Sequence, residues 1–305
     1  MDFVKEFLYV SDHAGFLELT TETWKNMWFP SQIPLSSDVA GIAQLNETDR
    51  EFYKFLFVFL GLAERLVNFN IEDLVKEFNC HDATHYYAEQ MAMENIHGKV
   101  YANILQLFFN GDMMKLKEYA VKVVADPTLK AKLDWLHTRV KNTKTRAEKV
   151  LIFLLIEGIF FISSFYSISL FRVRGMLNGI CLANDYISKD ELLHTRAAAV
   201  LYNSLIPAKE RPDAAWIKRL FQEAVEVEYS FIAAKSKNVT LVVPGEIKKF
   251  LQATCDRILQ SIGVEPIYGS HAPVTCPLSY NGCIKSVNFF EREGTDYSTK
   301  VTNDL

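Results

Sequence analysis

Most of this chain consists of long segments with helical periodicity that are apolar on nearly every face. Residues 52–78 and 150–171 are rich in Leu, Ile, Val and Phe, and a helix of this composition has to be buried on all sides. Turn residues such as Asp126-Pro127 and Gly263 separate these segments, and no run alternates with the period of a strand. The pattern predicts an all-α bundle. The expected helices span residues 52–78, 85–109, 115–124, 129–140, 150–171, 180–203, 214–234 and 244–262.

The overall composition limits the classes of protein to which the chain can belong. Hydrophobic residues make up 49% of its 305 residues, which is typical of a globular protein rather than a disordered one. The formal net charge is -4 and there is no basic run, so no nucleic-acid partner is expected. Five scattered cysteines without a CxxC pair, and an N-terminus without a signal-peptide pattern, favour a reducing compartment, the cytoplasm.

The character of the sequence changes near residue 270. Residues 1–269 are expected to form a single helical domain, whereas residues 270–305 contain Pro273, Pro277 and Gly294 and lack helical periodicity. We expect this C-terminal part to be a flexible tail. Judged from its residues alone, it is either a frayed end or a segment that docks on a partner.

Residues 150–171 also meet the length requirement of a transmembrane helix. Twenty-two residues without Lys or Arg form a helix of about 33 Å, which is long enough to cross a bilayer. Glu157 lies near the middle of this segment, however, and a lone carboxylate is unfavourable in lipid. Because neighbouring apolar segments also carry isolated acids, burial of the helices against one another explains all of them together. No stable membrane insertion is expected.

Acidic and histidine side chains interrupt the apolar segments in a pattern that occurs twice. A lone Glu in one segment is followed by a Glu-x-x-His pair in the next, and a second such unit follows 93 to 97 residues later. Glu and His three residues apart on a helix share a face, so each pair presents an oxygen and a nitrogen to one point. The six residues are Glu64, Glu94, His97, Glu157, Glu191 and His194.

Four carboxylates in buried helices require a counter-charge. Taken alone, Glu64 could pair with Arg65, and a single Glu-x-x-His spacing often occurs by chance. Four unpaired buried carboxylates would be prohibitively unfavourable, whereas two metal ions would neutralise them, and oxygen with imidazole ligands suits iron or manganese. A Glu from each of two helices and Glu-x-x-His from two others is the ligand set of ferritin-like di-iron and di-manganese bundles. The predicted fold class is therefore a ferritin-like di-metal helical bundle with extra helices.

One tyrosine follows the first His on the same helix face. Tyr101 lies four residues after His97, so its side chain points toward the expected metal site. A core tyrosine with a satisfied hydroxyl is the simple interpretation. Beside two metal ions, a shielded phenol is also a candidate redox group, because a dry pocket protects a phenoxyl radical. The side chains expected to form the apolar wall are Phe161, Phe165 and Ile187, at four- or eight-residue spacing from two of the acids.

Six runs of the sequence resemble the small subunit of class I ribonucleotide reductases. They span nearly the whole chain in the order of that family. The length and the closing Val-Thr-Asn-Asp-Leu are most similar to the herpesvirus versions, and among these to the gammaherpesvirus group. The runs are EFYKFLF at 51–57, AERLVNFNI at 63–71, MENIHGKVYANIL at 93–105, IEGIFFISSFYSI at 156–168, RGMLNGICLANDYISKDELLH at 174–194 and NFFEREGTDY at 288–297.

The resemblance implies a radical-generating enzyme subunit. The six Glu and His residues would bind two iron ions, with manganese as an alternative, and reaction of the ferrous form with dioxygen would oxidise Tyr101 to a stable radical. The oxidising equivalent would pass to a cysteine of a separate large subunit, which reduces ribonucleoside diphosphates to deoxyribonucleotides. Residues that match the transfer route are Trp28, Asp190 and Tyr297, together with His97, and Trp24 is a rival for Trp28.

The resemblance also implies partners for the chain. It implies a homodimer, and a C-terminus that docks into the large subunit, with Tyr297 in the stretch between core and anchor. If the viral likeness holds, the location is the cytoplasm of an infected cell. The residues expected to form the anchor are Lys300, Val301, Thr302, Asn303, Asp304 and Leu305.

The sequence departs from the family's pattern at two positions. The first metal ligand of the family is most often Asp, and Glu64 stands here, one methylene longer and one residue closer to the next ligand. Lys189 replaces the usual Arg before the transfer Asp, which keeps the charge but not the planar guanidinium. Three other functions remain open: a ferritin-like iron store, a di-iron oxygenase with its own substrate, and a viral subunit that has lost catalysis.

Overall fold

The computed structural model describes residues 8–273, 276 and 278, and every regular element in this part of the chain is a helix. The α-helices are α2 (Ala14–Lys25), α3 (Val39–Gln44), α4 (Glu47–Val75), α5 (His81–Phe108), α6 (Met113–Val124), α7 (Pro127–Asn142), α8 (Arg146–Gly158), α9 (Ile162–Val173), α10 (Asn178–Leu205), α11 (Ala214–Lys235) and α12 (Pro244–Ser261). Three short 3-10 helices are η1 (Pro30–Gln32), η2 (Leu35–Asp38) and η3 (Ala208–Glu210).

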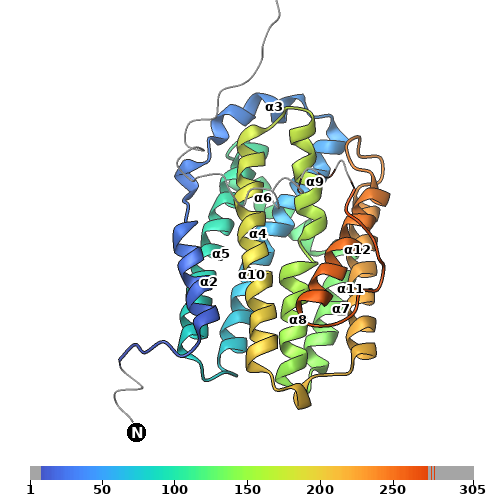
Figure 1. Cartoon of the computed structure of the whole chain (residues 1–305). Helices are drawn as coiled ribbons and strands as arrows, with labels where there is room; N and C mark the ends of the chain where they lie inside the picture. Colours follow the sequence, from blue (N-terminus) through green and yellow to red (C-terminus); the bar gives the residue numbers. More distant parts are fainter. Residues whose placement is uncertain (1–7, 274–275, 277, 279–305) are drawn as a thin grey trace, which may run out of the picture.

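Four long segments form the centre of the molecule, and they are α4, α5, α8 followed by α9, and α10. Helix α4 packs along α5 and against α8, while α10 packs along α8, α9 and α5. Helix α2 covers α5 and α10 on one side, and α7, α11 and α12 cover the other side, as Figure 1 shows. This arrangement confirms the predicted all-α bundle with extra helices, although the expected set of helices did not include α2 and α3.

A carboxylate from a distant part of the chain caps the start of α10. Asp38 accepts hydrogen bonds from the backbone N–H groups of Gly179 at 3.1 Å and Ile180 at 2.6 Å, which otherwise lack partners at a helix N-terminus. A Cβ at position 179 would come within 2.8 Å of the Pro34 carbonyl oxygen, so only glycine permits this approach. The contact fixes the end of the helix that carries Asp190, Glu191 and His194.

Two aspartates tie the N-terminal segment to the start of α5. Asp82 accepts hydrogen bonds from the backbone N–H groups of Asp12 at 2.8 Å and His13 at 2.6 Å, and from the hydroxyl of Tyr9. In return, Asp12 accepts from the N–H groups of His81 at 2.9 Å and Asp82 at 3.1 Å. Asp82 therefore binds the backbone just before α2, and Asp12 satisfies free donors at the N-terminus of α5.

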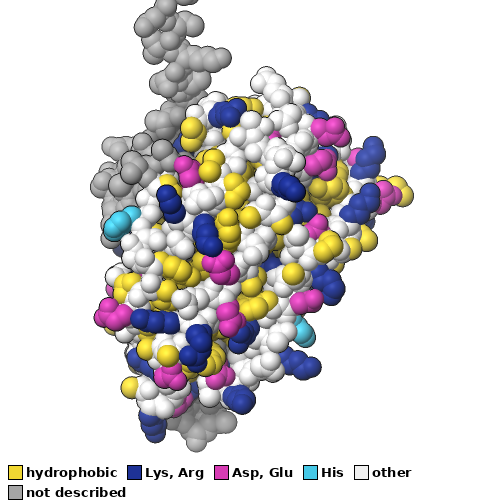
Figure 2. Space-filling model, turned by 90° about the vertical axis from the view of Figure 1, so that its right-hand side faces the viewer, with side chains coloured by type: hydrophobic (Ala, Val, Ile, Leu, Met, Phe, Trp, Pro, Cys, Tyr) yellow, Lys and Arg dark blue, Asp and Glu magenta, His cyan; other side chains and the backbone are white. Residues whose placement is uncertain are grey.

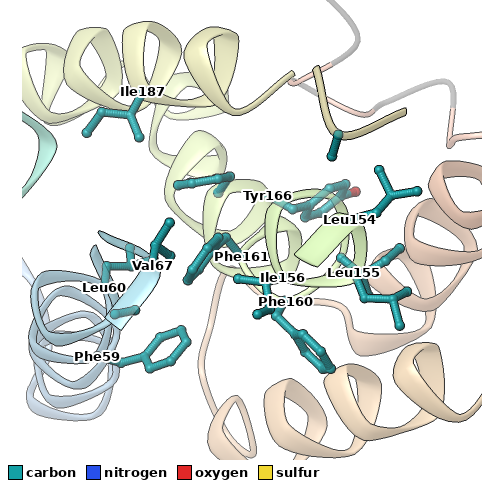
Figure 3. Packing of buried hydrophobic residues seen from close by; sticks show 14 of the residues in the cluster. Phe59, Leu60, Val67, Leu154, Leu155, Ile156, Phe160, Phe161, Tyr166 and Ile187 are labelled. Atoms are coloured by element: carbon teal, nitrogen blue, oxygen red, sulfur yellow. The ribbon is translucent and has the colours of Figure 1, made fainter. Parts of the chain in front are cut away.

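The segment expected as one helix over residues 150–171 is interrupted, so that expectation was wrong. Helix α8 ends at Gly158 and α9 begins at Ile162. Between them, the N–H groups of Ile159 and Phe160 both bond to the carbonyl of Leu155, at 3.0 and 3.2 Å. The chain then starts a new helix with Phe161 directed toward α4 and Phe160 directed away from it (Figure 3).

The interrupted segment lies in the core of the protein. By length and composition, residues 146–173 would be able to cross a membrane, but 94% of their most apolar window is buried inside the molecule. Burial against other helices therefore accounts for this composition. On the face shown in Figure 2, Lys and Arg side chains are interspersed with Asp and Glu and form no large basic patch.

Candidate metal centre

Four helices each deliver an acidic side chain to the centre of the bundle. Glu64 comes from α4, Glu94 from α5, Glu157 from α8 and Glu191 from α10, and all four are buried. With two histidines they form two overlapping groups, and within each group the candidate ligand atoms lie within 4.8 Å of one another. The groups are Glu64, Glu94, His97 and Glu191, and Glu94, Glu157, Glu191 and His194.

Glu94 and Glu191 lie between the two imidazoles. His97 Nδ1 is 3.0 Å from Glu94 Oε2 and 3.3 Å from Glu191 Oε1. His194 Nδ1 is 3.0 Å from Glu94 Oε1 and 3.2 Å from Glu191 Oε2. Each of these carboxylates therefore turns one oxygen toward each histidine, and both acids belong to both groups.

Glu64 and Glu157 occupy the two ends of the cluster. Glu64 Oε1 is 3.9 Å from His97 Nδ1, and Glu157 Oε2 is 3.7 Å from His194 Nδ1. Glu64 Oε2 and both carboxylate oxygens of Glu157 are buried and have no hydrogen-bond partner. Buried acceptors without donors are rare and unfavourable. The cluster therefore fits two metal ions, which would supply the missing partners. Glu64 lies close enough to the other side chains to act as a metal ligand despite its extra methylene.

The pKa values of the acids reflect this arrangement. Burial raises the pKa of Glu64 and of Glu157 well above the usual range, and nearby carboxylates raise both further. Burial also opposes ionisation of Glu94, but the imidazoles of His97 and His194 hold the pKa of Glu94 well below its usual value. Four acids thus share only two neutralising histidines, and this imbalance of charge favours a cation.

The Asp190 carboxylate connects the cluster to the indole of Trp28. Trp28 Nε1 donates to Asp190 Oδ2 at 2.8 Å, and the same oxygen is 3.0 Å from His97 Nε2. The rings of Trp28 and His97 lie nearly parallel, with centroids 6.0 Å apart. Trp28 is 2% exposed, whereas the rival Trp24 is 56% exposed. Asp190 therefore orients the imidazole of His97 from the side opposite the cluster.

Tyr101 is buried and its hydroxyl has no hydrogen-bond partner. Burial raises the pKa of the phenol well above its usual value, and the carboxylate of Glu64 raises it further. The ring of Phe57 lies 6.3 Å from that of Tyr101, centroid to centroid. The phenol is therefore protonated at neutral pH and shielded from water.

The three predicted wall residues lie in the same buried core as Tyr101. Phe161 and Phe165 have ring centroids 6.3 Å apart, and Figure 3 shows Phe161 beside Val67 of α4, with Ile187 on the helix at the top of the view. Their role around a radical stays a prediction. Tyr297 and the anchor at residues 300–305 lie outside the described residues.

Two further side chains near the cluster were not among the predicted site residues. Gln90 is fully buried and donates from Nε2 to Glu94 Oε1 at 3.3 Å, and Phe57 flanks Tyr101. A signal for both exists in the sequence, because Gln90 precedes Glu94 by four residues and Phe57 precedes Glu64 by seven. These spacings place them on the same helix faces as the acids.

Solved structures share this fold. The dimanganese(II)-NrdF protein of Streptococcus sanguinis superposes with a TM-score of 0.79 at 19% identity, over 90% of this chain and 97% of that one. The Rnr4 homodimer of Saccharomyces cerevisiae gives a TM-score of 0.77 at 21% identity, over 95% of this chain and 88% of that one. Both likenesses are to ferritin-like helical bundles and concern the fold alone.

Sequence relatives cover the whole chain. The ribonucleoside-diphosphate reductase small subunit of equine herpesvirus 2 is 64% identical over all 305 residues of both chains, and that of human herpesvirus 8 is 61% identical over the same length. The corresponding Epstein-Barr virus subunit is 56% identical over 302 residues, 99% of this chain and 100% of that one. The family model for the small chain of ribonucleotide reductase matches residues 7–277. The chain therefore belongs to the family of ribonucleotide reductase small chains, and it is one subunit of an oxidoreductase whose other component is a large subunit.

Proposed function

We propose that this subunit stores an oxidising equivalent as a radical on the phenol of Tyr101. The observation that carries the proposal is a buried phenol with an unpartnered hydroxyl, on the same helix as two members of a cluster that fits two metal ions. Because its raised pKa keeps the phenol protonated, Tyr101 gives up one electron and its hydroxyl proton together. Dioxygen would be the oxidant and water the product, with two further electrons from two ferrous ions and the fourth from an external one-electron reductant. A dry surrounding then protects the radical.

The proposed ions are iron, held by the four glutamates and two histidines of the cluster. When bound, two iron ions supply the capacity to react with dioxygen and to withdraw one electron from a phenol. The same oxygen and imidazole ligands also suit manganese. The residues themselves hold the cations, exclude water and orient the imidazoles.

Trp28, Asp190 and Tyr297 are the proposed route by which the oxidising equivalent leaves this subunit. Asp190 accepts from the Trp28 indole and faces His97 with the same oxygen. An indole that loses an electron becomes acidic, so the adjacent carboxylate is placed to take the proton. Tyr297 would continue the route within the tail, which is the proposed docking segment for the large subunit.

The proposed assembly also contains a second copy of this chain. Leu62, Leu66 and Phe69 are 40%, 51% and 55% exposed, and their spacing places them in one stripe on α4. Apolar stripes of this kind commonly mark interfaces. The solved yeast relative is a homodimer, and this supports a second copy as the occupant of the stripe. We place the assembly in the host-cell cytoplasm.

Electron paramagnetic resonance after addition of ferrous iron and air tests the proposal. We expect a tyrosyl doublet in the wild type and none in Tyr101→Phe, with metal content unchanged. Iron bound without any radical in the wild type would contradict the proposal and favour a subunit that has lost catalysis. Loading with manganese alone, in parallel, tests the choice of metal, and a radical formed only with manganese would overturn iron.

A further inference from the structure

A buried ion pair lies beside the interruption between α8 and α9, and it contains none of the metal-centre residues. Lys132 of α7 is 4% exposed, and Glu228 of α11 is fully buried. Lys132 Nζ lies 2.6 Å from Glu228 Oε2. A buried pair of this kind seldom stabilises a fold more than apolar side chains of the same size would, so its position in the molecule requires another explanation.

Lys132 faces the end of the first helix. Its ammonium group donates to the carbonyl oxygen of Phe160 at 2.6 Å. That carbonyl belongs to the residues that follow α8, where the last backbone acceptors of a helix lose their partners and carry partial negative charge. A cation at this point satisfies the backbone that the interruption exposes.

Glu228 faces the start of the second helix. One carboxylate oxygen accepts from the hydroxyl of Ser163, and the backbone N–H of Ser163 also bonds to this carboxylate. Ser163 is the second residue of α9, where free N–H groups carry partial positive charge. The ion pair therefore places a positive charge at the end of α8 and a negative charge at the beginning of α9.

The surroundings of the pair are aromatic and dry. Lys132 Nζ lies 4.3 Å from the ring centroid of Phe59 and 4.4 Å from that of Phe231. Burial lowers the pKa of Lys132 and raises that of Glu228, and each charged partner opposes the effect of burial on the other. Loss of either Lys132 or Glu228 would leave the other charge unpaired, buried away from water and next to the interruption.

The interruption determines how two side chains of the site are placed relative to each other. In a continuous helix, Glu157 and Phe161 would lie on one face, one turn apart. Here Glu157 lies in the last turn of α8, while Phe161 packs on Phe59 of α4, with ring centroids 6.3 Å apart. Its neighbour Phe160 packs on Trp135 of α7, with ring centroids 5.5 Å apart.

We propose that Lys132 and Glu228 are positioning residues for the metal centre, because they keep α8 and α9 in the interrupted form that sets Glu157 and Phe161. The inference extends the proposed function of the centre and rests on it. The contacts of Lys132 with Phe160, and of Glu228 with Ser163, carry it.

Two variants and a matched control separate positioning from stability. Lys132→Met removes the cation alone. The double variant Lys132→Met with Glu228→Leu removes both charges and retains apolar volume, so it regains stability without restoring either cap. Lys235→Met is the control, because Lys235 forms a 2.7 Å pair with Asp126 between α11 and the start of α7, and the pair does not include residues of the interruption.

The first measurement is amide hydrogen exchange of the metal-free, full-length protein, read on peptides that cover residues 159–165. We expect exchange to accelerate about tenfold or more in Lys132→Met and in the double variant, and to stay unchanged in Lys235→Met. Unchanged exchange in the double variant would overturn the proposal. If Lys132→Met does not fold, Ser163→Ala removes one hydroxyl donor, and the same acceleration to a smaller degree is expected.

The second measurement is the radical signal after loading with iron and air. We expect both pair variants to show an altered hyperfine pattern of the tyrosyl signal and a lifetime shortened about tenfold, while the control matches the wild type. A double variant with wild-type signal and lifetime would reduce the pair to a structural role and overturn the inference. A wild type without any radical would contradict the proposed function instead, and hydrogen exchange would still decide whether the pair holds the interruption.

Discussion

The indole nitrogen of Trp28 lies 2.8 Å from Asp190 Oδ2, although 162 positions separate the two residues in the chain. The same oxygen is 3.0 Å from His97 Nε2, so a single carboxylate oxygen links the indole to a candidate metal ligand. Asp190 also directly precedes Glu191 on α10. Any displacement of this carboxylate therefore acts on the cluster and on the indole together.

Replacement of Asp190 by Asn should separate radical formation from its use. The amide keeps the size of the side chain but cannot take a proton from the Trp28 indole. We expect the Tyr101 radical to form, while nucleotide reduction with the large subunit falls about 100-fold or more. Trp28→Phe should behave in the same way, and Trp24→Phe is the control because Trp24 is exposed. Full reduction by Asp190→Asn would exclude this route.

Replacement of Glu157 by Leu should stabilise the metal-free protein while it disrupts metal binding. Both oxygens of Glu157 are buried without a hydrogen-bond partner, and an apolar residue of similar size removes this penalty. We expect the free energy of unfolding of the metal-free form to rise by about 1–3 kcal/mol. Metal content per chain should fall below that of the wild type. Denaturant unfolding and elemental analysis check the two effects, and a metal-free form less stable than wild type would contradict the first.

Asp82 should make the stability of the N-terminal segment depend on acid pH. Burial opposes ionisation of Asp82, but hydrogen bonds from Tyr9 and from the backbone of His13 and Asp12 lower the pKa of its carboxyl to about 2. Because the usual value is about 3.9, the stabilisation is present above that value and is lost as the pH falls toward 2. Asp82→Asn should flatten this part of the stability profile.

The control for Asp82 is Asp73→Asn, which alters an exposed acid on α4. Unfolding free energies measured between pH 2 and 6 should show the acid-dependent loss in the wild type and in the control, and not in Asp82→Asn. Parallel profiles for all three proteins would contradict the assignment.

Replacement of Phe69 by Glu should weaken the proposed homodimer. A charge at the Phe69 end of the apolar stripe on α4 would be buried without a partner in a second copy. Sedimentation velocity of the full chain should shift from dimer to monomer, with the helical signal in circular dichroism unchanged. Val121→Glu is the control, because Val121 is 70% exposed on α6 and outside the stripe. A variant at position 69 that stays dimeric would place the interface elsewhere.

Deletion of residues 299–305 should leave the metal centre and the radical intact and abolish nucleotide reduction with the large subunit. The deleted residues include none of the six candidate metal ligands, so loading with metal should match that of the full chain. Paired measurements of the radical and of product formation check the two expectations. Retained reduction after the deletion would exclude the tail as the docking segment.

The metal-centre residues were predictable because their signal is local. Glu94 with His97 and Glu191 with His194 each lie on one helix at a spacing that shares a face, and burial follows from the apolar residues around them. The unfavourable energy of buried acids then required a cation whatever the exact packing was. The spacing of acids and histidines within apolar segments was therefore enough to identify the six residues that the structure brings together.

The interruption after Gly158 was not predictable in the same way. The local sequence is uniformly apolar, and the groups that stabilise the broken form, Lys132 and Glu228, come from helices far along the chain. Helix α2 was also missed, although its start has a local cap, because His13 Nδ1 accepts from the N–H of Phe16 at 3.3 Å. Asp82 of α5 adds a distant partner, since it accepts from the N–H groups of Asp12 and His13 just before this helix. Long-range partners thus determined the interruption, whereas α2 combines a local cap with a distant one.

The sharing of Glu94 and Glu191 by both groups has a consequence for how substitutions act on the centre. Each of these acids would serve two ions, so replacing either one would weaken both positions together. Glu64 and Glu157 each belong to one group, so replacing either of them would weaken one position and leave the other its full set of side chains. The two halves of the centre would therefore fail together when a shared acid is lost and separately when an end acid is lost.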